Sequence, residues 1–155
     1  MPTVFEKLNL KEHPAVVVLN APESFEPEVR ALAGRQIRRK VAGKAPVSFA
    51  IAFVKTQTEI DQAVKALVPR MDGDVVLWFA YPKGSSKRYT CDFNRDTGWA
   101  VLGKSGFEPV RMVAIDEDWS AIRFRRAAFI KTMMRGKEHT LSAEGRRKAG
   151  AARKR

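Results

Sequence analysis

The sequence predicts an α/β fold, in which strands and helices alternate along the chain. Three apolar runs have the length and composition of buried strands, namely residues 16–19, 49–54 and 75–81. Between the second and third runs, apolar residues recur at helical spacing after Thr56 and Glu59, which have the spacing of a capping box. Strands that are apolar throughout are typical of parallel sheets covered on both faces. We therefore expect a mostly parallel sheet with helices on both sides.

Smaller elements complete the predicted fold. Ser24 is a candidate N-cap of a short helix, and residues 36–41 have the character of a brief edge strand. A further helix is expected over residues 94–102. Residues 110–115 and the alternating residues 122–125 flank an acidic turn, which indicates an antiparallel hairpin at one edge of the sheet. The predicted architecture is a Rossmann-like sandwich with this C-terminal antiparallel edge hairpin.

The charge of the chain is distributed unevenly. The net charge is +12, and the last 21 residues contain eight basic and two acidic residues, so that half of the net charge, +6, lies there. Glycine, alanine, lysine and arginine dominate this segment, and such a composition buries too little apolar surface to order a chain. We predict a single α/β domain over residues 1–134, followed by a basic, flexible tail over residues 135–155.

Several classes of protein do not fit this sequence. The longest apolar run, residues 75–81, is far shorter than the roughly 20 residues of a membrane span, and residues 1–10 do not have the pattern of a secretory signal. Cys91 is the only cysteine, and His13 and His139 are far apart in the sequence. We therefore expect a cytoplasmic protein with no internal disulfide and no bound metal.

Four short segments have distinctive patterns, namely residues 7–10, 18–22, 77–83 and 116–120. The most specific of them are the Pro-Lys pair after an apolar strand and the acidic-Trp-Ser turn. Over residues 5–126 the chain resembles, in these segments, the DUF3052 family of bacterial proteins of unknown function. It implies one bacterial, cytoplasmic domain and does not imply an activity.

The order of predicted elements is also similar to a trimmed methyltransferase-like Rossmann domain. In such domains, and in dinucleotide-binding ones, glycines after the first strand let the backbone approach the cofactor. Here residues 20–24, Asn-Ala-Pro-Glu-Ser, occupy that place and contain no glycine, and Pro22 has no N–H to donate. The sequence therefore predicts that no cofactor is bound there.

Polar side chains gather where the predicted strands end. Ligands bind at the carboxyl ends of parallel strands, so this edge is the candidate binding site. Lys83 could hold an anionic group, the serines could donate hydrogen bonds to it, an aspartate could orient or titrate, and Trp119 could stack on a ring. The candidate residues are Asn20, Lys83, Ser85, Ser86, Asp116, Asp118, Trp119 and Ser120.

These residues also have a purely structural interpretation. Lys83 would then pair with an acidic residue of the turn, Asn20 would cap a loop, and the serines would be solvated. Trp119 would cover the edge of the sheet.

A basic stretch runs from the last predicted strand into the tail. It could follow a phosphate backbone, although the arginines of the strand could equally protect a sheet edge from intermolecular pairing. The residues are Arg123, Arg125, Arg126, Lys131, Arg135, Arg146, Arg147, Lys148, Arg153, Lys154 and Arg155.

Two functions therefore stay open. The leading hypothesis is a non-catalytic module that associates with nucleic acid through its basic tail, without sequence preference. The alternative is a small enzyme or ligand-binding protein for an anionic metabolite at the carboxyl edge of the sheet.

Overall fold

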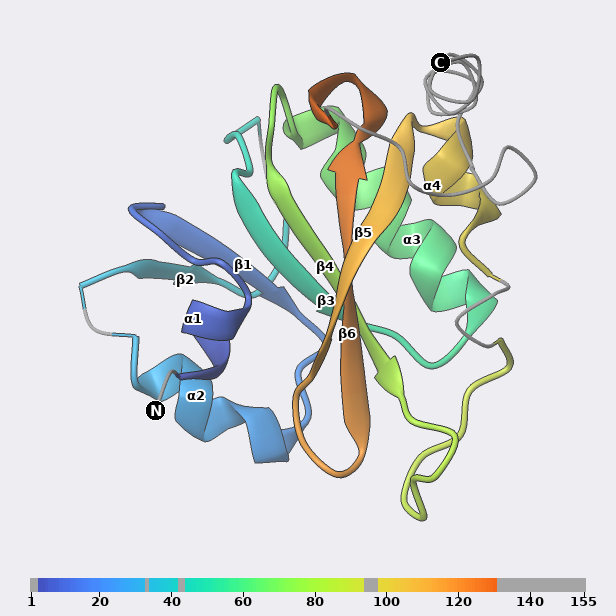
Figure 1. The fold of residues 1–155 in the computed structure, drawn as a ribbon. Helices are drawn as coiled ribbons and strands as arrows, with labels where there is room; N and C mark the ends of the chain where they lie inside the picture. Colours follow the sequence, from blue (N-terminus) through green and yellow to red (C-terminus); the bar gives the residue numbers. More distant parts are fainter. Residues whose placement is uncertain (1–2, 33, 42–43, 94–97, 131–155) are drawn as a thin grey trace, which may run out of the picture.

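Six strands form one sheet in the order β2-β1-β3-β4-β6-β5 (Figure 1). The computed structural model describes residues 3–32, 34–41, 44–93 and 98–130. The first four strands are parallel, and β6 runs antiparallel to both β4 and β5. The strands are β1 Ala15–Leu19, β2 Gln36–Arg38, β3 Phe49–Phe53, β4 Val76–Pro82, β5 Phe107–Ala114 and β6 Trp119–Arg126. The predicted Rossmann-like α/β fold with a C-terminal antiparallel hairpin is confirmed.

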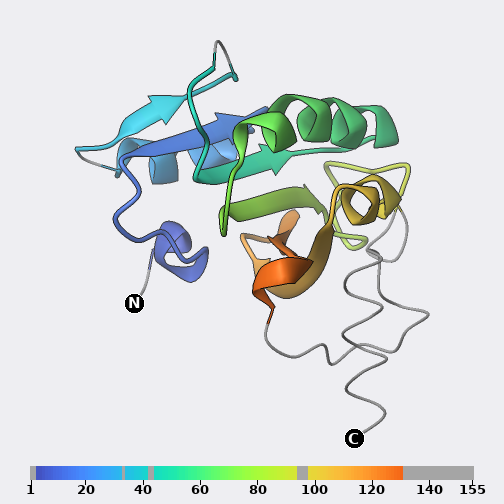
Figure 2. The same ribbon diagram turned by 90° about the horizontal axis from the view of Figure 1, so that it is seen from above.

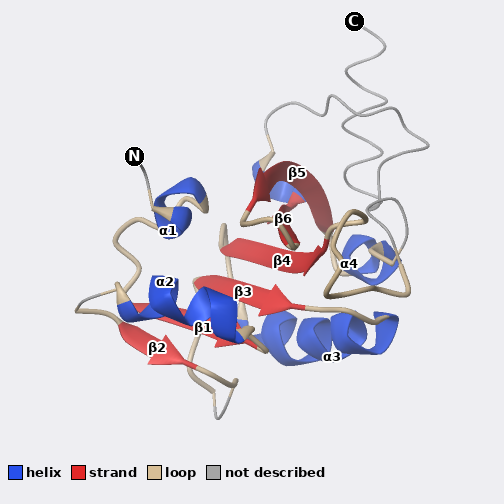
Figure 3. Ribbon diagram, turned by 90° about the horizontal axis from the view of Figure 1, so that it is seen from below, coloured by secondary structure: helices blue, strands red, loops and turns tan. Residues whose placement is uncertain are grey.

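Helices cover both faces of this sheet, as Figures 2 and 3 show from its two ends. Helices α1 and α2 lie on one face, and α3 and α4 lie on the other. The helices are α1 Val4–Lys7, α2 Glu26–Arg30, α3 Gln57–Leu67 and α4 Ala100–Lys104, with short 3₁₀ turns at Glu23–Phe25, Val68–Arg70 and Ala127–Phe129. Within the described ranges, none of these helices has the length and apolarity needed to cross a membrane.

The two central strands explain why the apolar runs were recognisable. Every residue of β3 and β4 is buried, because successive side chains point to opposite faces of the sheet and helices cover both faces. Trp78 and Phe79, neighbours on β4, belong to the two opposite cores, and both are 0% exposed.

Helix α3 begins as the capping box predicts. The hydroxyl oxygen of Thr56 accepts a hydrogen bond from the Glu59 amide at 3.1 Å, and the Glu59 carboxylate accepts one from the Lys55 amide at 2.8 Å. The apolar stripe of the helix, which includes Ile60, Val64 and Leu67, is buried against the sheet. These contacts fix the first turn of α3 directly after the carboxyl end of β3.

Several smaller predictions differ from the structure. Ser24 caps no helix, because a 3₁₀ turn begins after Pro22 and leads into α2 without a side-chain cap. The brief edge strand ends at Arg38, and the described part of the helix expected over 94–102 is helical only from Ala100, where α4 starts. Residues 94–97 and the predicted tail, residues 135–155, lie outside the described residues.

The hairpin also differs in which strand forms the edge. Strand β6 lies between β4 and β5, so β5 is the edge strand. The arginines of β6 therefore do not protect a free edge. On β5 the register shifts between Pro109 and Arg111, and such a bulge next to a proline limits pairing at an edge.

Candidate functional site

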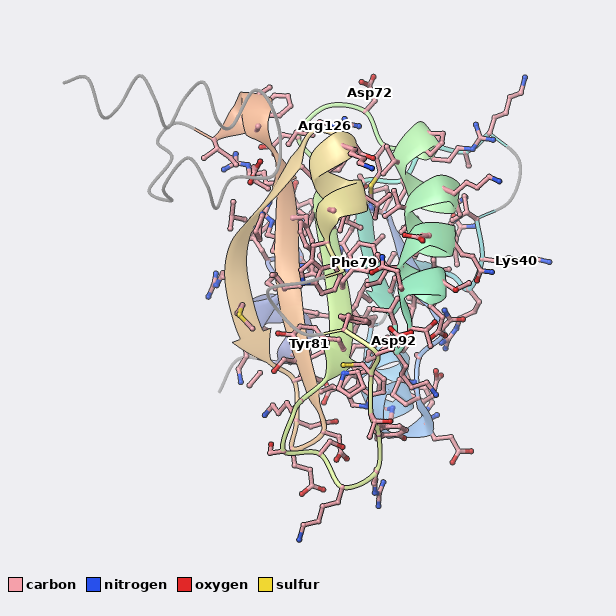
Figure 4. The ribbon with its side chains drawn as sticks, turned by 90° about the vertical axis from the view of Figure 1, so that its right-hand side faces the viewer. Lys40, Asp72, Phe79, Tyr81, Asp92 and Arg126 are labelled. Atoms are coloured by element: carbon pink, nitrogen blue, oxygen red, sulfur yellow. The ribbon has the colours of Figure 1, made fainter. Side chains whose placement is uncertain are left out.

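A cavity of about 500 Å³ opens beyond the carboxyl end of β4. Figure 4 places Tyr81 at this end of the strand, level with Asp92 on the loop that follows β4. Aromatic, sulfur-containing and polar side chains share the wall. The lining residues are Tyr81, Pro82, Lys83, Gly84, Ser86, Tyr89, Thr90, Cys91, Phe93, Met112 and Ser120.

The strands supply one wall of the cavity. Tyr81 of β4 pairs in register with Ser120 of β6, and Met112 of β5 lies on the same face of the sheet. Met112 is 45% exposed, so the cavity reaches the free edge of the sheet. The Tyr81 ring contacts Phe93 at 6.1 Å and Trp99 at 5.8 Å between centroids. This wall is mostly apolar, with the hydroxyl of Ser120 on it, and is held by the core beneath α4.

The loop over residues 83–93 supplies the other wall and is fixed at its start. The Lys83 amide donates to the Asp118 carbonyl at 2.8 Å, and the Ser86 hydroxyl donates to the Asp118 carboxylate at 2.8 Å. The same hydroxyl oxygen accepts hydrogen bonds from the Arg88 and Tyr89 amides at 3.2 and 3.1 Å. Because Asp118 is only 8% exposed, these bonds join the loop to a buried point of the hairpin.

The loop is fixed again at its end. The Asp92 carboxylate accepts a hydrogen bond at 2.8 Å from the amide of Gln57, in the first turn of α3, and the Asp92 amide donates to the Lys55 carbonyl at 3.1 Å. A carboxylate at a helix N-terminus is favoured by the helix dipole as well as by this bond. Asp92 thus caps α3, the helix that precedes it in the sequence. The loop is thus anchored at both ends of its span.

Trp119 supports the loop from inside the fold. Its ring contacts Tyr89 at 5.0 Å and Phe53 at 5.1 Å between centroids, and it is only 2% exposed. This packing fits the structural interpretation of Trp119, in which it covers the edge of the sheet, better than stacking on a ligand. Tyr89, which does line the cavity, lies beneath the ammonium of Lys55 at 5.7 Å.

The predicted ligand residues divide into two groups. Lys83, Ser86 and Ser120 line the cavity. The others serve the structure around it or lie apart. The Asp116 carboxylate accepts bonds from the Asp118 and Trp119 amides at 2.8 and 2.9 Å and so closes the hairpin turn.

Ser85 and Asn20 lie apart from the cavity. Ser85 is exposed and is not among the lining residues. Asn20 follows the end of β1, where its backbone is left-handed with φ 59°. Its side-chain Nδ2 donates to the Phe53 carbonyl at 3.4 Å. The expected ion pair of Lys83 with the acidic turn is also absent, since neither salt bridge among the described residues involves Lys83.

Sequence reasoning missed the aromatic part of the site. Tyr81 was assigned to a buried strand, and Tyr89, Thr90, Cys91 and Phe93 lie in a segment without periodicity. The usable signal was the long polar segment directly after β4, because loops after parallel strands carry ligand contacts. The Cys91 thiol donates to the Phe93 carbonyl at 2.7 Å and so belongs to this wall.

The side chains that line the cavity can bind a ligand through charge, hydroxyl groups and ring faces. The Ser86 hydroxyl already donates once and accepts twice, so it is not poised as a nucleophile. Within the described parts of the chain, no three histidine, cysteine or acidic side chains cluster closely enough to hold a metal ion. What remains is a half-buried cation, Lys83, beside hydroxyl groups and aromatic rings.

The arginines of β6 have structural roles at the opposite end of the sheet. The Arg125 guanidinium forms a bidentate pair with Asp74 at 2.6 and 2.9 Å, and this pairing lowers the pKa of Asp74. Arg126 donates to the Met71 and Gly73 carbonyls and lies over the Phe107 ring at 4.7 Å. These contacts occupy two of the three arginines that we had expected to follow a phosphate backbone.

Arg123 is the exception among them. It is half-buried, and its Nε atom is buried with no hydrogen-bond partner among the described residues. Burial, and then repulsion by Arg125, lower the pKa of Arg123. The remaining predicted nucleic-acid residues, Lys131, Arg135, Arg146, Arg147, Lys148, Arg153, Lys154 and Arg155, lie outside the described residues.

No known protein family matches the chain, and no curated protein matches it. Solved structures of the N-methyltransferase NodS from Bradyrhizobium japonicum WM9 are similar in fold. One shares 12% identity with a TM-score of 0.46 and covers 72% of this chain and 85% of the other. A second, in complex with S-adenosyl-l-homocysteine, shares 15% identity with a TM-score of 0.44 and covers 72% of this chain and 65% of the other.

Proposed function

We propose that this protein binds a small anionic molecule with a flat or apolar part in the cavity beyond β4. The single observation that carries the proposal is the cavity itself, with Lys83 beside three aromatic side chains. Its volume of about 500 Å³ is in the range of small-molecule sites, which are mostly apolar with a few placed polar groups. This is the ligand-binding alternative that the sequence left open.

The character of the walls defines the class of ligand. Tyr81, Tyr89 and Phe93 offer ring faces and edges to a flat group, and Met112 adapts its shape at the open side. Lys83 supplies a point charge for a carboxylate or a phosphate, and Ser120 and Thr90 supply hydroxyl donors. Anchoring of the loop at both ends means that little ordering is required when the ligand enters.

Substitution Lys83→Gln is expected to weaken binding of the anionic ligand about tenfold, because a charge-assisted bond becomes a neutral one. Candidate ligands are first found by thermal shift, using nucleotides, phosphorylated metabolites and adenosylmethionine, since a ligand that binds the folded state raises the melting temperature. The dissociation constant of each hit is then measured calorimetrically for both proteins.

The matched control is Lys87→Gln, which removes the same charge from the same loop outside the cavity. It should leave the affinity within about twofold, because exposed charges are screened. Equal losses in the two variants, or hits whose affinity depends on neither lysine, would contradict binding in this cavity.

Association with nucleic acid is the second candidate function, and the observation that favours it is the net charge of +6 over the last 21 residues. We propose this association as non-specific, since it rests on charge alone, and contacts to phosphates carry no sequence information. This proposal and ligand binding in the cavity can both hold, because the first rests on the basic residues of the tail and the second on the described residues that line the cavity.

Removal of residues 136–155 is expected to weaken binding to unrelated duplexes about equally and to flatten its salt dependence. If about six phosphates are contacted, the affinity of the full chain should fall roughly a thousandfold between about 50 and 200 mM salt. Fluorescence anisotropy with two duplexes of different sequence measures both effects, and the melting temperature reports whether the shortened chain is folded. A shortened chain that binds as well as the full chain, or a full chain that does not bind at low salt, would show this proposal to be wrong.

A further inference from the structure

Two arginines stand side by side on the face of the sheet opposite the cavity. Arg111 of β5 and Arg123 of β6 are directly paired in register, and Trp78 of β4 is the next residue in the same row. Trp78 belongs to the core beneath α1 and α2, whereas Ile122 and Met112, the neighbours of these arginines along the strands, face the other side. Strands β5 and β6, with α1 in front of the sheet, can be followed in Figure 1.

Neither arginine has an acidic partner in the described part of the chain. The two salt bridges there join Arg39 to Glu26 and Arg125 to Asp74. Glu108, the nearest acidic residue along β5, is in register with Arg125 and not with Arg123. The Asp74 carboxylate is paired with Arg125, and its charge acts on Arg123 without forming an ion pair with it.

The surroundings of the pair are also positively charged. His13 lies near enough to Arg123 and Arg35 that their charges, after burial, help to lower the pKa of His13. The Arg35 guanidinium itself donates to the carbonyls of Lys11 and His13. An anion placed at Arg123 would therefore meet positive charge from Arg111 and Arg125, which the nearby Asp74, paired with Arg125, offsets only in part.

This arrangement is unfavourable in the absence of a ligand. Like charges directly opposite each other on a β-ladder destabilise the pairing. A buried Nε–H without an acceptor loses its hydration and gains no hydrogen bond in return. Arg111 is exposed and could turn away into water, but the half-buried Arg123 is held between β4 and β5.

We propose that Arg111 and Arg123 form a binding site for a phosphate group. A phosphate would neutralise both guanidinium groups, supply acceptors for the unpaired Nε–H, and accept the forked bonds that guanidinium groups give to tetrahedral oxyanions. The exposed side of Arg111 provides access. The site is independent of the cavity beyond β4, which opens on the other face of the sheet.

The proposal is tested by calorimetry of the full chain with pyrophosphate at constant ionic strength, maintained with chloride. The full chain should bind, and Arg111→Gln should weaken binding about tenfold. The matched control is Lys65→Gln, which removes one exposed charge from α3 on the opposite face and should change affinity less than about twofold. Equal losses in the two variants, or no binding by the full chain, would overturn the proposal.

A second variant separates a ligand site from a structural arginine. Arg123→Met keeps the apolar stem and removes the unpaired guanidinium, so it should raise the melting temperature by about 3 °C without ligand and abolish pyrophosphate binding. A variant that melts below the full chain and still binds pyrophosphate would overturn the proposal.

The phosphate could belong to a small phosphorylated molecule or to a nucleic-acid backbone. A short DNA duplex is therefore added to the pyrophosphate complex of the full chain and of Arg111→Gln. If the duplex displaces pyrophosphate from the full chain, and this displacement depends on Arg111, the phosphate recognised by the site is that of a nucleic-acid backbone. Binding of pyrophosphate that depends on Arg111, without competition by the duplex, identifies a small molecule.

Discussion

Trp78→Ala is expected to lower the free energy of unfolding by about 4 kcal/mol, the range found for large aromatic residues removed from a core. Trp78 is fully buried at the centre of β4, between Ile51 of β3 and Arg123 of β6. Its indole N–H donates to the Leu8 carbonyl at 2.7 Å, which joins the chain after α1 to the sheet. Since domains are stable by only about 5–15 kcal/mol, this loss is a large part of the total. Urea unfolding followed by circular dichroism measures it.

The contribution of the hydrogen bond can be isolated by comparing two Trp→Phe variants. Trp78 and Trp119 are 0% and 2% exposed, but the Trp119 Nε–H is buried with no partner among the described residues. Trp78→Phe leaves the Leu8 carbonyl without its donor, whereas Trp119→Phe removes an unsatisfied group. We expect Trp78→Phe to cost about 2 kcal/mol more than Trp119→Phe. Equal costs would mean that the bond to Leu8 adds nothing to the packing of the ring.

The parts of the fold that the sequence predicted are those specified by neighbouring residues. Strands β3 and β4 read as continuous apolar runs because both of their faces are buried. Helix α3 was visible because the Thr56 hydroxyl accepts from the Glu59 amide and the Glu59 carboxylate accepts from the Lys55 amide, which requires only local spacing. Local signals of this kind do not depend on where the rest of the chain lies.

The parts that it did not predict depend on contacts between distant segments. The alternating residues of β6 fit either an edge strand or a strand between β4 and β5, and only the second position places Arg123 beside both Trp78 and Arg111. Helix α2 begins without a side-chain cap, after a 3₁₀ turn that follows Pro22, so the N-cap pattern at Ser24 did not locate its start.

In the candidate site, too, local patterns were predicted and contacts between distant segments were not. The rule for parallel strands brought Lys83, Ser86 and Ser120 to one edge, and all three line the cavity. The rule could not show that Trp119 points into the core or that Asp118 is used by Ser86, because the hairpin turn determines which residues face inward. The aromatic wall comes from residues 89–93, whose position is determined by the bond of Asp92 to α3.

Asp118→Ala is expected to release the start of the loop over residues 83–93 and to lower the free energy of unfolding by about 2 kcal/mol. The substitution removes the acceptor of the Ser86 hydroxyl, in a place where Asp118 is largely buried and water cannot fully replace it. Lys87 and Arg88 are exposed in the same loop and are cleavage sites for trypsin. Tryptic cleavage after them should become about tenfold faster, because proteolysis follows the population of the open loop.

The control for this variant is Glu117→Ala, which removes an exposed carboxylate from the neighbouring position of the same turn. It should leave both the cleavage rate and the unfolding midpoint nearly unchanged. If Asp118→Ala is cleaved no faster than Glu117→Ala, the Asp118 carboxylate does not hold the loop, and the remaining contacts, including the bonds of Asp92, are sufficient. Because Ser86 acts through Asp118, adding Ser86→Ala to Asp118→Ala should accelerate cleavage little further, whereas Ser86→Ala in the otherwise unchanged chain should accelerate it by itself. Additive effects of the two substitutions would show that Ser86 holds the loop through the Arg88 and Tyr89 amides independently of Asp118.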